Sequence, residues 1–241
     1  MRTARVVVAV ALAVSLAAEL HGQTLDWPPS LRDGQARLVR LKYAGGDWDQ
    51  DMGKKGDRNL LLWYREVTGF AVAEQTEAVS AGELKGMQGA ALPPFVLVTG
   101  RGRVDLDDAE TAALREYCID KGGMVVADNG GGTFDKSFRA TVKRLFPDSP
   151  LVDIPVDDVL FRQPFQLPNG APPLWHHSGT RAQGIRVGER WAVFYHQGDL
   201  LDAWKDGHSG ASEEIANMAY RMGFNLLHYA YSHPAGGNPR P

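Results

Sequence analysis

A strand–helix–strand unit that decides the fold occupies residues 95–128, which read FVLVTGRGRVDLDDAETAALREYCIDKGGMVVAD. Residues 95–99 form a short apolar run, which is the pattern of a strand buried on both faces. Asp107, followed by Glu110 three positions later, predicts a helix that begins with a capping box. Residues 124–128 predict a second buried strand. Two buried strands joined by a helix indicate a parallel pair in a sheet with helices on its faces.

The same alternation of strands and helices continues on both sides of this unit. We predict a strand at 36–43, a helix at 59–67, a helix at 134–146, a short strand at 151–154, a hairpin of 184–187 with 191–195, and a final helix capped by Ser212. The fold class is therefore α/β. It has three layers, with a mostly parallel central sheet flanked by helices and a β-hairpin in the C-terminal part.

The N-terminus is typical of a secretory signal peptide. Two arginines precede an apolar stretch from Val6 to Ala18, which is too short to span a bilayer. We expect cleavage between Ala18 and Gln23, a periplasmic or secreted mature protein, and no stable membrane insertion after cleavage. The predicted organisation is a signal peptide at 1–22, a linker at 23–35, the α/β domain at 36–232 and a flexible tail at 233–241.

The composition excludes some classes of protein. The net charge is −3 and no run of Lys and Arg stands out, so nucleic acid is not an expected partner. Cys118 is the one cysteine, so no disulfide can form within the chain. We expect Cys118 to be a packing residue within its helix.

Polar clusters follow three of the predicted strands. Because parallel strands end on the same side of a sheet, these clusters should meet at one rim, where ligands bind in open α/β sheets. The predicted ligand-binding residues are Asp47, Trp48, Asp49, Thr99, Gly100, Arg101, Asp128, Asn129, Gly130 and, from the next helix, Arg139.

A series of motifs resembles a family of domains of unknown function, the one numbered 4159. The resemblance extends from Ala36 to Tyr231. In chain order the motifs are Leu41-Lys42-Tyr43-x-Gly45-Gly46-Asp47-Trp48, Phe95-x-x-x-Thr99-Gly100, Leu114-Arg115-x-Tyr117 with Gly122-Gly123, Asp128 with Phe134-Asp135 and Phe138-Arg139, and Gly223-x-Asn225 with Tyr229-Ala230. The resemblance implies a fold similar to class I glutamine amidotransferases and flavodoxin-like domains, and no established activity.

Comparison with amidotransferases predicts a site without a nucleophile. Residues 99–102 resemble the glycine-containing segment that supplies the oxyanion hole, and residues 124–130 resemble the strand that ends in the nucleophile elbow. Asp128-Asn129 stands where the catalytic cysteine would be, and Cys118 lies in the preceding helix. We therefore expect no amidotransferase activity, no catalytic residue and no cofactor.

The carboxylates of the rim allow more than one interpretation. A hard divalent cation could be held by Asp47, Asp49, Asp51 and Asp128, and an acidic pair among them could supply an acid and a base, but aspartates also serve as turn residues. We expect Arg101 or Arg139 to pair with them instead. His176-His177 and His196 with Asp199 lack the spacing of a zinc site.

Three functions follow from these observations. The leading hypothesis is an exported, non-catalytic domain that binds a small molecule or an envelope protein. The alternative is a carboxylate- or metal-dependent hydrolase that uses Asp47, Asp49 and Asp128. A third hypothesis is a structural subunit of an envelope assembly.

Overall fold

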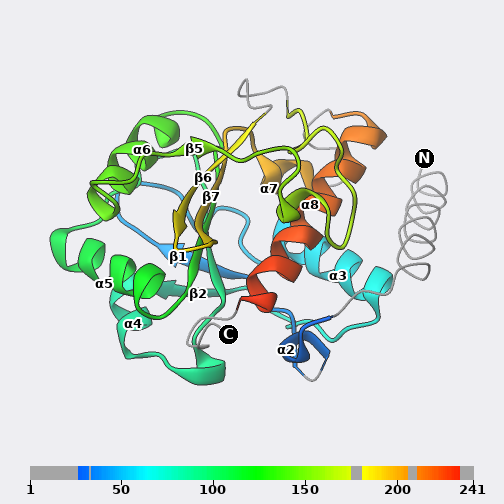
Figure 1. Cartoon of the computed structure of the whole chain (residues 1–241), viewed down its shortest axis with the longest axis horizontal. Coiled ribbons are helices and arrows are strands. Elements are labelled where there is room, and N and C mark those ends of the chain that lie inside the picture. Colours follow the sequence, from blue (N-terminus) through cyan, green and yellow to red (C-terminus); the bar gives the residue numbers. More distant parts are fainter. Residues whose placement is uncertain (1–26, 33, 175–180, 206–210, 234–241) are drawn as a thin grey trace.

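The computed structural model describes residues 27–32, 34–174, 181–205 and 211–233 (Figure 1). The predicted signal peptide, residues 23–26 and 33 of the predicted linker, the His176-His177 pair and the tail beyond 233 lie outside these ranges. The described chain forms one seven-stranded sheet in the order β2-β1-β3-β4-β7-β6-β5. The strands are β1 (Val39–Lys42), β2 (Glu77–Ser80), β3 (Phe95–Val98), β4 (Met124–Asp128), β5 (Val152–Asp153), β6 (Ala182–Val187) and β7 (Arg190–His196).

The sheet is mostly parallel. Strands β2, β1, β3, β4 and β7 run in one direction, while β6 pairs antiparallel with both β7 and β5. The chain passes from β1 outward to β2 and then returns to the other side of β1 for β3. The order of the strands therefore reverses between β1 and β3, which is the place where open α/β sheets bind ligands.

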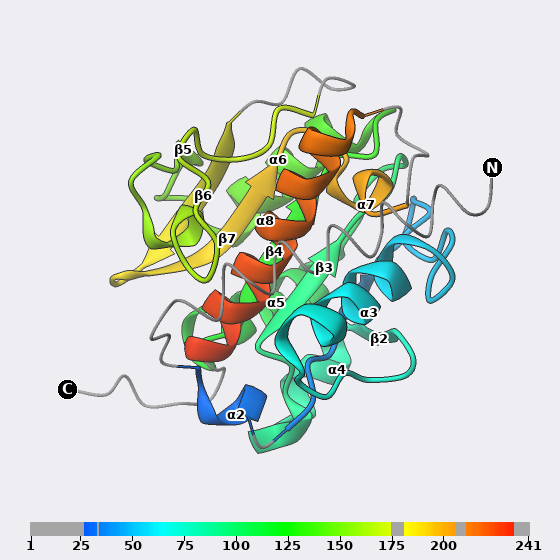
Figure 2. The same cartoon turned by 90° about the vertical axis from the view of Figure 1, so that its right-hand side faces the viewer.

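Helices cover both faces of the sheet, which confirms the predicted three layers. On one face lie α3 (Gly56–Thr68) and the long helix α8 (Glu213–Ser232), with α7 (Leu200–Ala203) beside them. On the other lie α4 (Ala81–Gly86), α5 (Asp108–Ile119) and α6 (Phe134–Leu145). Figure 2 shows α8 crossing the sheet diagonally. The short elements α2 (Pro29–Arg32), η1 (Gly89–Ala91) and η2 (Val159–Phe161) complete the described structure.

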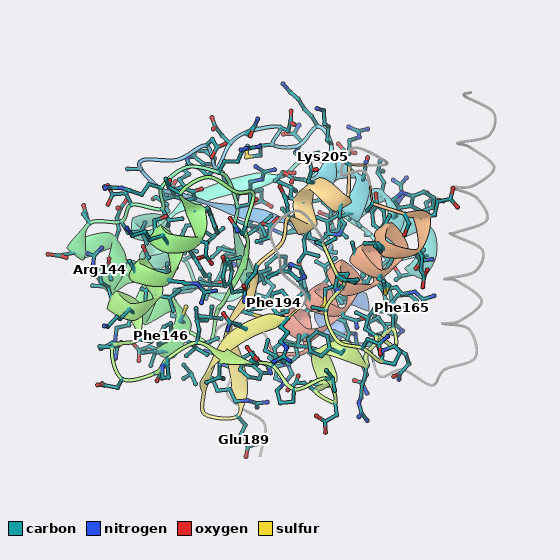
Figure 3. All side chains as sticks on the ribbon, turned by 90° about the horizontal axis from the view of Figure 1, so that it is seen from above. Arg144, Phe146, Phe165, Glu189, Phe194 and Lys205 are labelled. Atoms are coloured by element: carbon teal, nitrogen blue, oxygen red, sulfur yellow. The ribbon has the colours of Figure 1, made fainter. Side chains whose placement is uncertain are left out.

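Side chains from both faces fill two apolar cores. Phe194 of β7 and Phe165 belong to the core under α3 and α8, and Phe146, which follows α6, belongs to the core on the opposite face (Figure 3). Glu189 projects from the tip of the β6–β7 hairpin. No helix within the described ranges combines the length and the apolar character needed to span a membrane.

The predicted helix caps are present. Asp107 accepts a hydrogen bond from the Glu110 amide, and the Glu110 side chain accepts one from the Asp107 amide, which is the capping box. Ser212 accepts from the Ile215 amide at the start of α8. Cys118 is fully buried in α5, and burial raises the pKa of its thiol to about 12, so the thiol stays protonated.

The sequence prediction missed the edge of the sheet. Strand β2 reads EAVS and has one fully buried side chain, so it lacks the apolar run that reveals β3 and β4. The first strand is also shorter than predicted, because the chain before Val39 makes only an isolated bridge between Ala36 and Val72. Its helix neighbour α3 begins three residues earlier than predicted, at Gly56.

Candidate functional site

A buried arginine fixes the loop that follows β1. Arg40 is 1% exposed, and its guanidinium donates to both carboxylate oxygens of Asp57, at 3.0 and 2.6 Å. It also donates to the carbonyl oxygens of Trp48 and Gln50, at 2.6 and 3.0 Å. One side chain of the sheet therefore binds both the start of α3 and the loop that carries the first polar cluster.

Asp47 holds the loop after β3. Its Oδ1 accepts hydrogen bonds from the amides of Arg101 and Gly102, at 2.7 and 2.9 Å. Burial opposes ionisation of Asp47, but these amides outweigh it, so the pKa of the carboxyl is lowered. The Asp47 carboxylate thus accepts both of these amide hydrogen bonds at the point between β1 and β3 where the strand order reverses.

The loops after β3 and β4 are joined directly. The Gly130 amide donates to the Gly100 carbonyl at 3.0 Å, and the Thr133 amide donates to the Arg101 carbonyl at 3.0 Å. A Cβ at Gly130 would lie 2.6 Å from the Gly100 oxygen, so this contact requires glycine. The Gly131 amide donates to Oδ1 of Asn129. The amides of Gly130 and Gly131 are therefore used within the protein.

Asp128 at the end of β4 is completely buried. Its Oδ2 accepts from the Leu201 amide at 2.9 Å, while its Oδ1 has no hydrogen-bond partner within the described structure. Burial raises the pKa of Asp128 well above the usual range of a carboxyl, and the negative charge of Asp199 raises it further. Burial also raises the pKa of Asp199, which caps α7. Burial and the adjacent negative charge therefore both favour the protonated form of Asp128.

Tyr43 connects the clusters. Its hydroxyl donates to the Thr99 carbonyl at 2.7 Å. Burial raises the pKa of the Tyr43 phenol, and the negative charges of Asp47 and Asp128 raise it further. The three predicted clusters thus lie together at the carboxyl ends of β1, β3 and β4.

Two further elements reach this edge of the sheet. The chain between β7 and α7 contacts it through Asn129, whose amide donates to the His196 and Gly198 carbonyls. The loop after β1 lies near α7 at the upper right of Figure 2. Lys205, two residues after α7, pairs with Asp51 of that loop at 3.4 Å. The rim is therefore closed on one side by α7.

The expected ion pairs with the rim carboxylates are wrong. Arg139 instead donates to Asp135 and to Gln183, at 2.8 and 2.9 Å, because α6 directs it toward β6. The Arg101 side chain is exposed and makes no ion pair within the described ranges. Backbone amides hold the Asp47 carboxylate, and the charge of Arg101 also lowers the pKa of Asp47 without a direct ion pair.

The exposed part of the rim is small. Thr99, Asp128 and Asn129 are buried, and Asp47, Trp48 and Gly100 are half-buried. Asp49 and Arg101 are exposed. A ligand that approaches this edge therefore meets one carboxylate, one guanidinium and the half-buried indole of Trp48.

No group of three His, Cys, Asp or Glu residues suited to a metal ion is present in the described ranges. His196, which the sequence left open as a ligand, is fully buried. Its Nδ1 accepts from the Gly198 amide at 2.9 Å, and its Nε2 lies 3.1 Å from the Pro172 carbonyl. Burial lowers the pKa of His196 to about 4, so the ring is neutral at physiological pH. Both of its nitrogens already have protein partners.

The sequence analysis missed Arg40 and Asp57 as residues that organise the rim, and it considered Asp199 only as a zinc ligand together with His196. Arg40 lies within a predicted strand, where a single charged residue is usually solvated, and Asp57 and Asp199 stand in polar segments. The available signal was Arg40 itself. It is flanked by the apolar residues Val39 and Leu41 in a strand that ends at the rim.

The chain belongs to the family described as Domain of unknown function (DUF4159), whose model matches residues 37–231. No curated protein matches the chain. The family supplies no activity, so the function has to be argued from the site.

Proposed function

We propose that this protein is an exported, non-catalytic domain that binds a small molecule or an envelope protein, and that its scaffold is a degenerate form of the amidotransferase-like fold. The strand order β2-β1-β3-β4 supports the scaffold, because it is the doubly wound order of flavodoxin-like domains. The signal-peptide pattern at residues 1–22 supports export.

One observation carries the proposal of a non-catalytic role. The amides of Arg101 and Gly102, which resemble an oxyanion hole in position, donate to Asp47 instead of facing a substrate. An oxyanion hole stabilises a transition state only when its donors are free to meet the developing charge. The next strand ends in Asp128, which is buried, accepts a hydrogen bond from the Leu201 amide, and stands in place of the cysteine whose thiol is the nucleophile of amidotransferases. Both components needed for acyl transfer are thus replaced by structural groups.

The hydrolase alternative needs carboxylates that face a common substrate. Asp47 accepts hydrogen bonds from the loop after β3, and Asp128 accepts one from Leu201 of α7. Asp49 is exposed. Ligand binding does not require carboxylates that face a common substrate. The Trp48 indole and the Arg101 guanidinium suffice to recognise a ligand with an anionic group and an apolar face.

The experiment is a ligand screen with a matched pair of variants. Purified mature protein is screened by thermal shift against sugars, nucleotides, amino acids and short peptides, and each hit is repeated with Arg101→Ala and Arg103→Ala. Arg103 lies in the same loop, is exposed, and pairs with Asp105 instead of facing the rim. We expect hits whose stabilisation is lost in Arg101→Ala and kept in Arg103→Ala. Hydrolysis of an ester or amide substrate that disappears in a folded Asp128→Asn variant would refute the proposal.

A further inference from the structure

A second polar site lies outside the rim, in a groove between α3 and the chain that leads into β2. The groove has a volume of about 370 Å³, which is within the range of small-molecule sites. Its walls include Gly53, Arg58, Leu62, Arg65, Glu74 and Thr76. None of these residues belongs to the rim, so the groove is independent of the proposed function.

A local irregularity of the sheet opens this groove. Ala36 is bridged to Val72, and Val39 is paired with Glu77. The segment from Ala36 to Val39 advances three residues, whereas the opposite segment from Val72 to Glu77 advances five. The second segment therefore contains two extra residues, and the chain bends at Glu74 and Gln75. Such bulges are frequent next to functional sites, because they redirect the backbone and its neighbouring side chains.

The outward bend leaves backbone donors without partners. The Ala73 amide donates to the Ala36 carbonyl, and the Glu77 amide donates to the Leu38 carbonyl. Between them, the amides of Glu74, Gln75 and Thr76 make no hydrogen bond within the described structure. Three backbone donors are thus free along one side of the groove.

Two arginines line the opposite side. Arg58 and Arg65 are seven residues apart on α3, which places them on one helix face and about 10 Å apart along its axis. Arg58 has no ionic or hydrogen-bonding partner in the described ranges, and Arg65 pairs only with its neighbour Glu66, at 3.3 Å with both side chains at least half exposed. An exposed ion pair of this kind contributes little free energy, so Arg65 can exchange Glu66 for another anion. Both guanidinium groups can therefore bind a ligand.

Glu74 also lines the groove, from the chain that leads into β2. It has no ionic partner among the described residues, and its carboxylate adds one negative charge to the wall opposite α3. The groove therefore offers positive charge at two separated places and repels a negative charge near Glu74. Leu62, half-buried between the arginines on α3, adds an apolar surface.

We propose that this groove binds a linear dicarboxylate, with one carboxylate on Arg58, the other on Arg65, and an uncharged apolar middle against Leu62. Guanidinium groups match carboxylates in a bidentate geometry. The spacing of the arginines selects for length, because a short dicarboxylate reaches one arginine only. The free amides of the bend complete the coordination of the carboxylate oxygens.

The test is a titration of the full-length mature protein with linear dicarboxylates from malonate to sebacate, followed by calorimetry or NMR at low ionic strength, where charge screening is weak. We expect saturable binding whose affinity rises with chain length to an optimum at the longer members, and no binding of the diamine putrescine. Arg58→Ala and Arg65→Ala should each weaken the best ligand about tenfold, the loss expected for one charged hydrogen-bonding group.

Two further variants separate the proposal from a general effect of charge. Glu74→Gln removes the repelling carboxylate and should strengthen binding, a gain that a damaged fold would not produce. Lys143→Ala, an exposed residue on α6 without an ion pair in the described ranges, should leave the affinity unchanged. The proposal is overturned if no dicarboxylate binds, if the affinity is independent of chain length, or if Lys143→Ala weakens binding as much as Arg58→Ala.

Discussion

Removal of Arg40 from β1 should destabilise the domain far more than removal of Arg37, a similar arginine two residues before that strand. Arg40 and Asp57 are 1% and 0% exposed, and Arg40→Met would leave the Asp57 carboxylate buried without its charged partner. The loss of one partner of a buried ion pair costs about 4 kcal/mol. That is a large fraction of the free energy of unfolding of an ordinary domain, about 5–15 kcal/mol.

Arg37 is the matched control. It also pairs through two nitrogens with one carboxylate, Glu77, but the two side chains are 22% and 43% exposed. Arg37→Met should therefore cost below about 1 kcal/mol, as is usual for exposed pairs. The comparison contrasts a buried ion pair with a partly exposed one, each made by a guanidinium with both oxygens of one carboxylate.

The assay is urea denaturation, followed by fluorescence and circular dichroism, with the free energies extrapolated to water. The double variant Arg40→Met/Asp57→Asn should be more stable than Arg40→Met alone, because no unpaired buried charge remains. If Arg40→Met costs no more than Arg37→Met, or if the two changes in the double variant simply add, the anchoring role assigned to Arg40 is wrong.

Four other outcomes are expected. The folded-state pKa of Asp128 is raised, so the domain should lose stability as the pH rises above about 4. In thermal melts, the Asp128→Asn variant should show a smaller decline with pH and should be more stable than the unaltered protein at pH 8. His196 has a lowered folded-state pKa, so its contribution is lost as the pH falls from 6.5 toward about 4, and a folded His196→Asn variant should lack this acid-side loss. Asp47→Ala should increase the hydrogen-exchange rate of the Gly102 amide, whereas Asp47→Asn keeps an acceptor and should change it less; equal rates would argue against the contact. N-terminal sequencing of the exported protein should begin between Ala18 and Gln23, and a sequence that begins at Met1 would contradict cleavage.

The sequence was sufficient for the buried part of the fold. The apolar runs at 95–99 and 124–128 and the Asp107 capping box identify β3, α5 and β4, because burial on both faces and helix capping leave local patterns. Strand β2 and helix α7 left no such pattern, since one is a partly exposed edge strand and the other spans four residues. Contacts with distant parts of the chain fix both elements: β2 pairs with β1, and α7 donates a hydrogen bond to Asp128.

The polar residues of the rim illustrate a different limit. Their convergence followed from the direction of parallel strands, and hydrogen bonds between the loops at Asp47, Arg101 and Gly130 bring them together. What each side chain contacts could not be predicted, because Leu201 and Asp199, which interact with Asp128, lie about 70 positions away in the sequence. No direct ion pair with Arg101 or Arg139 forms among the described residues: amides hold Asp47, whose pKa the charge of Arg101 also lowers, and a second carboxyl lies near Asp128.

The central claim is that the carboxylates of the rim serve the fold and not a reaction, and carboxyl-carbon NMR of the mature protein tests it most directly. Resonances of Asp47 and Asp128, assigned with Asp47→Asn and Asp128→Asn, are followed through a pH titration with and without Mg²⁺. We predict that Asp47 titrates below the usual range of an aspartate, that Asp128 titrates well above it, and that neither responds to Mg²⁺. An Asp128 carboxyl with an ordinary pKa, together with shifts of both residues on addition of Mg²⁺, would contradict the account and favour a metal-dependent hydrolase.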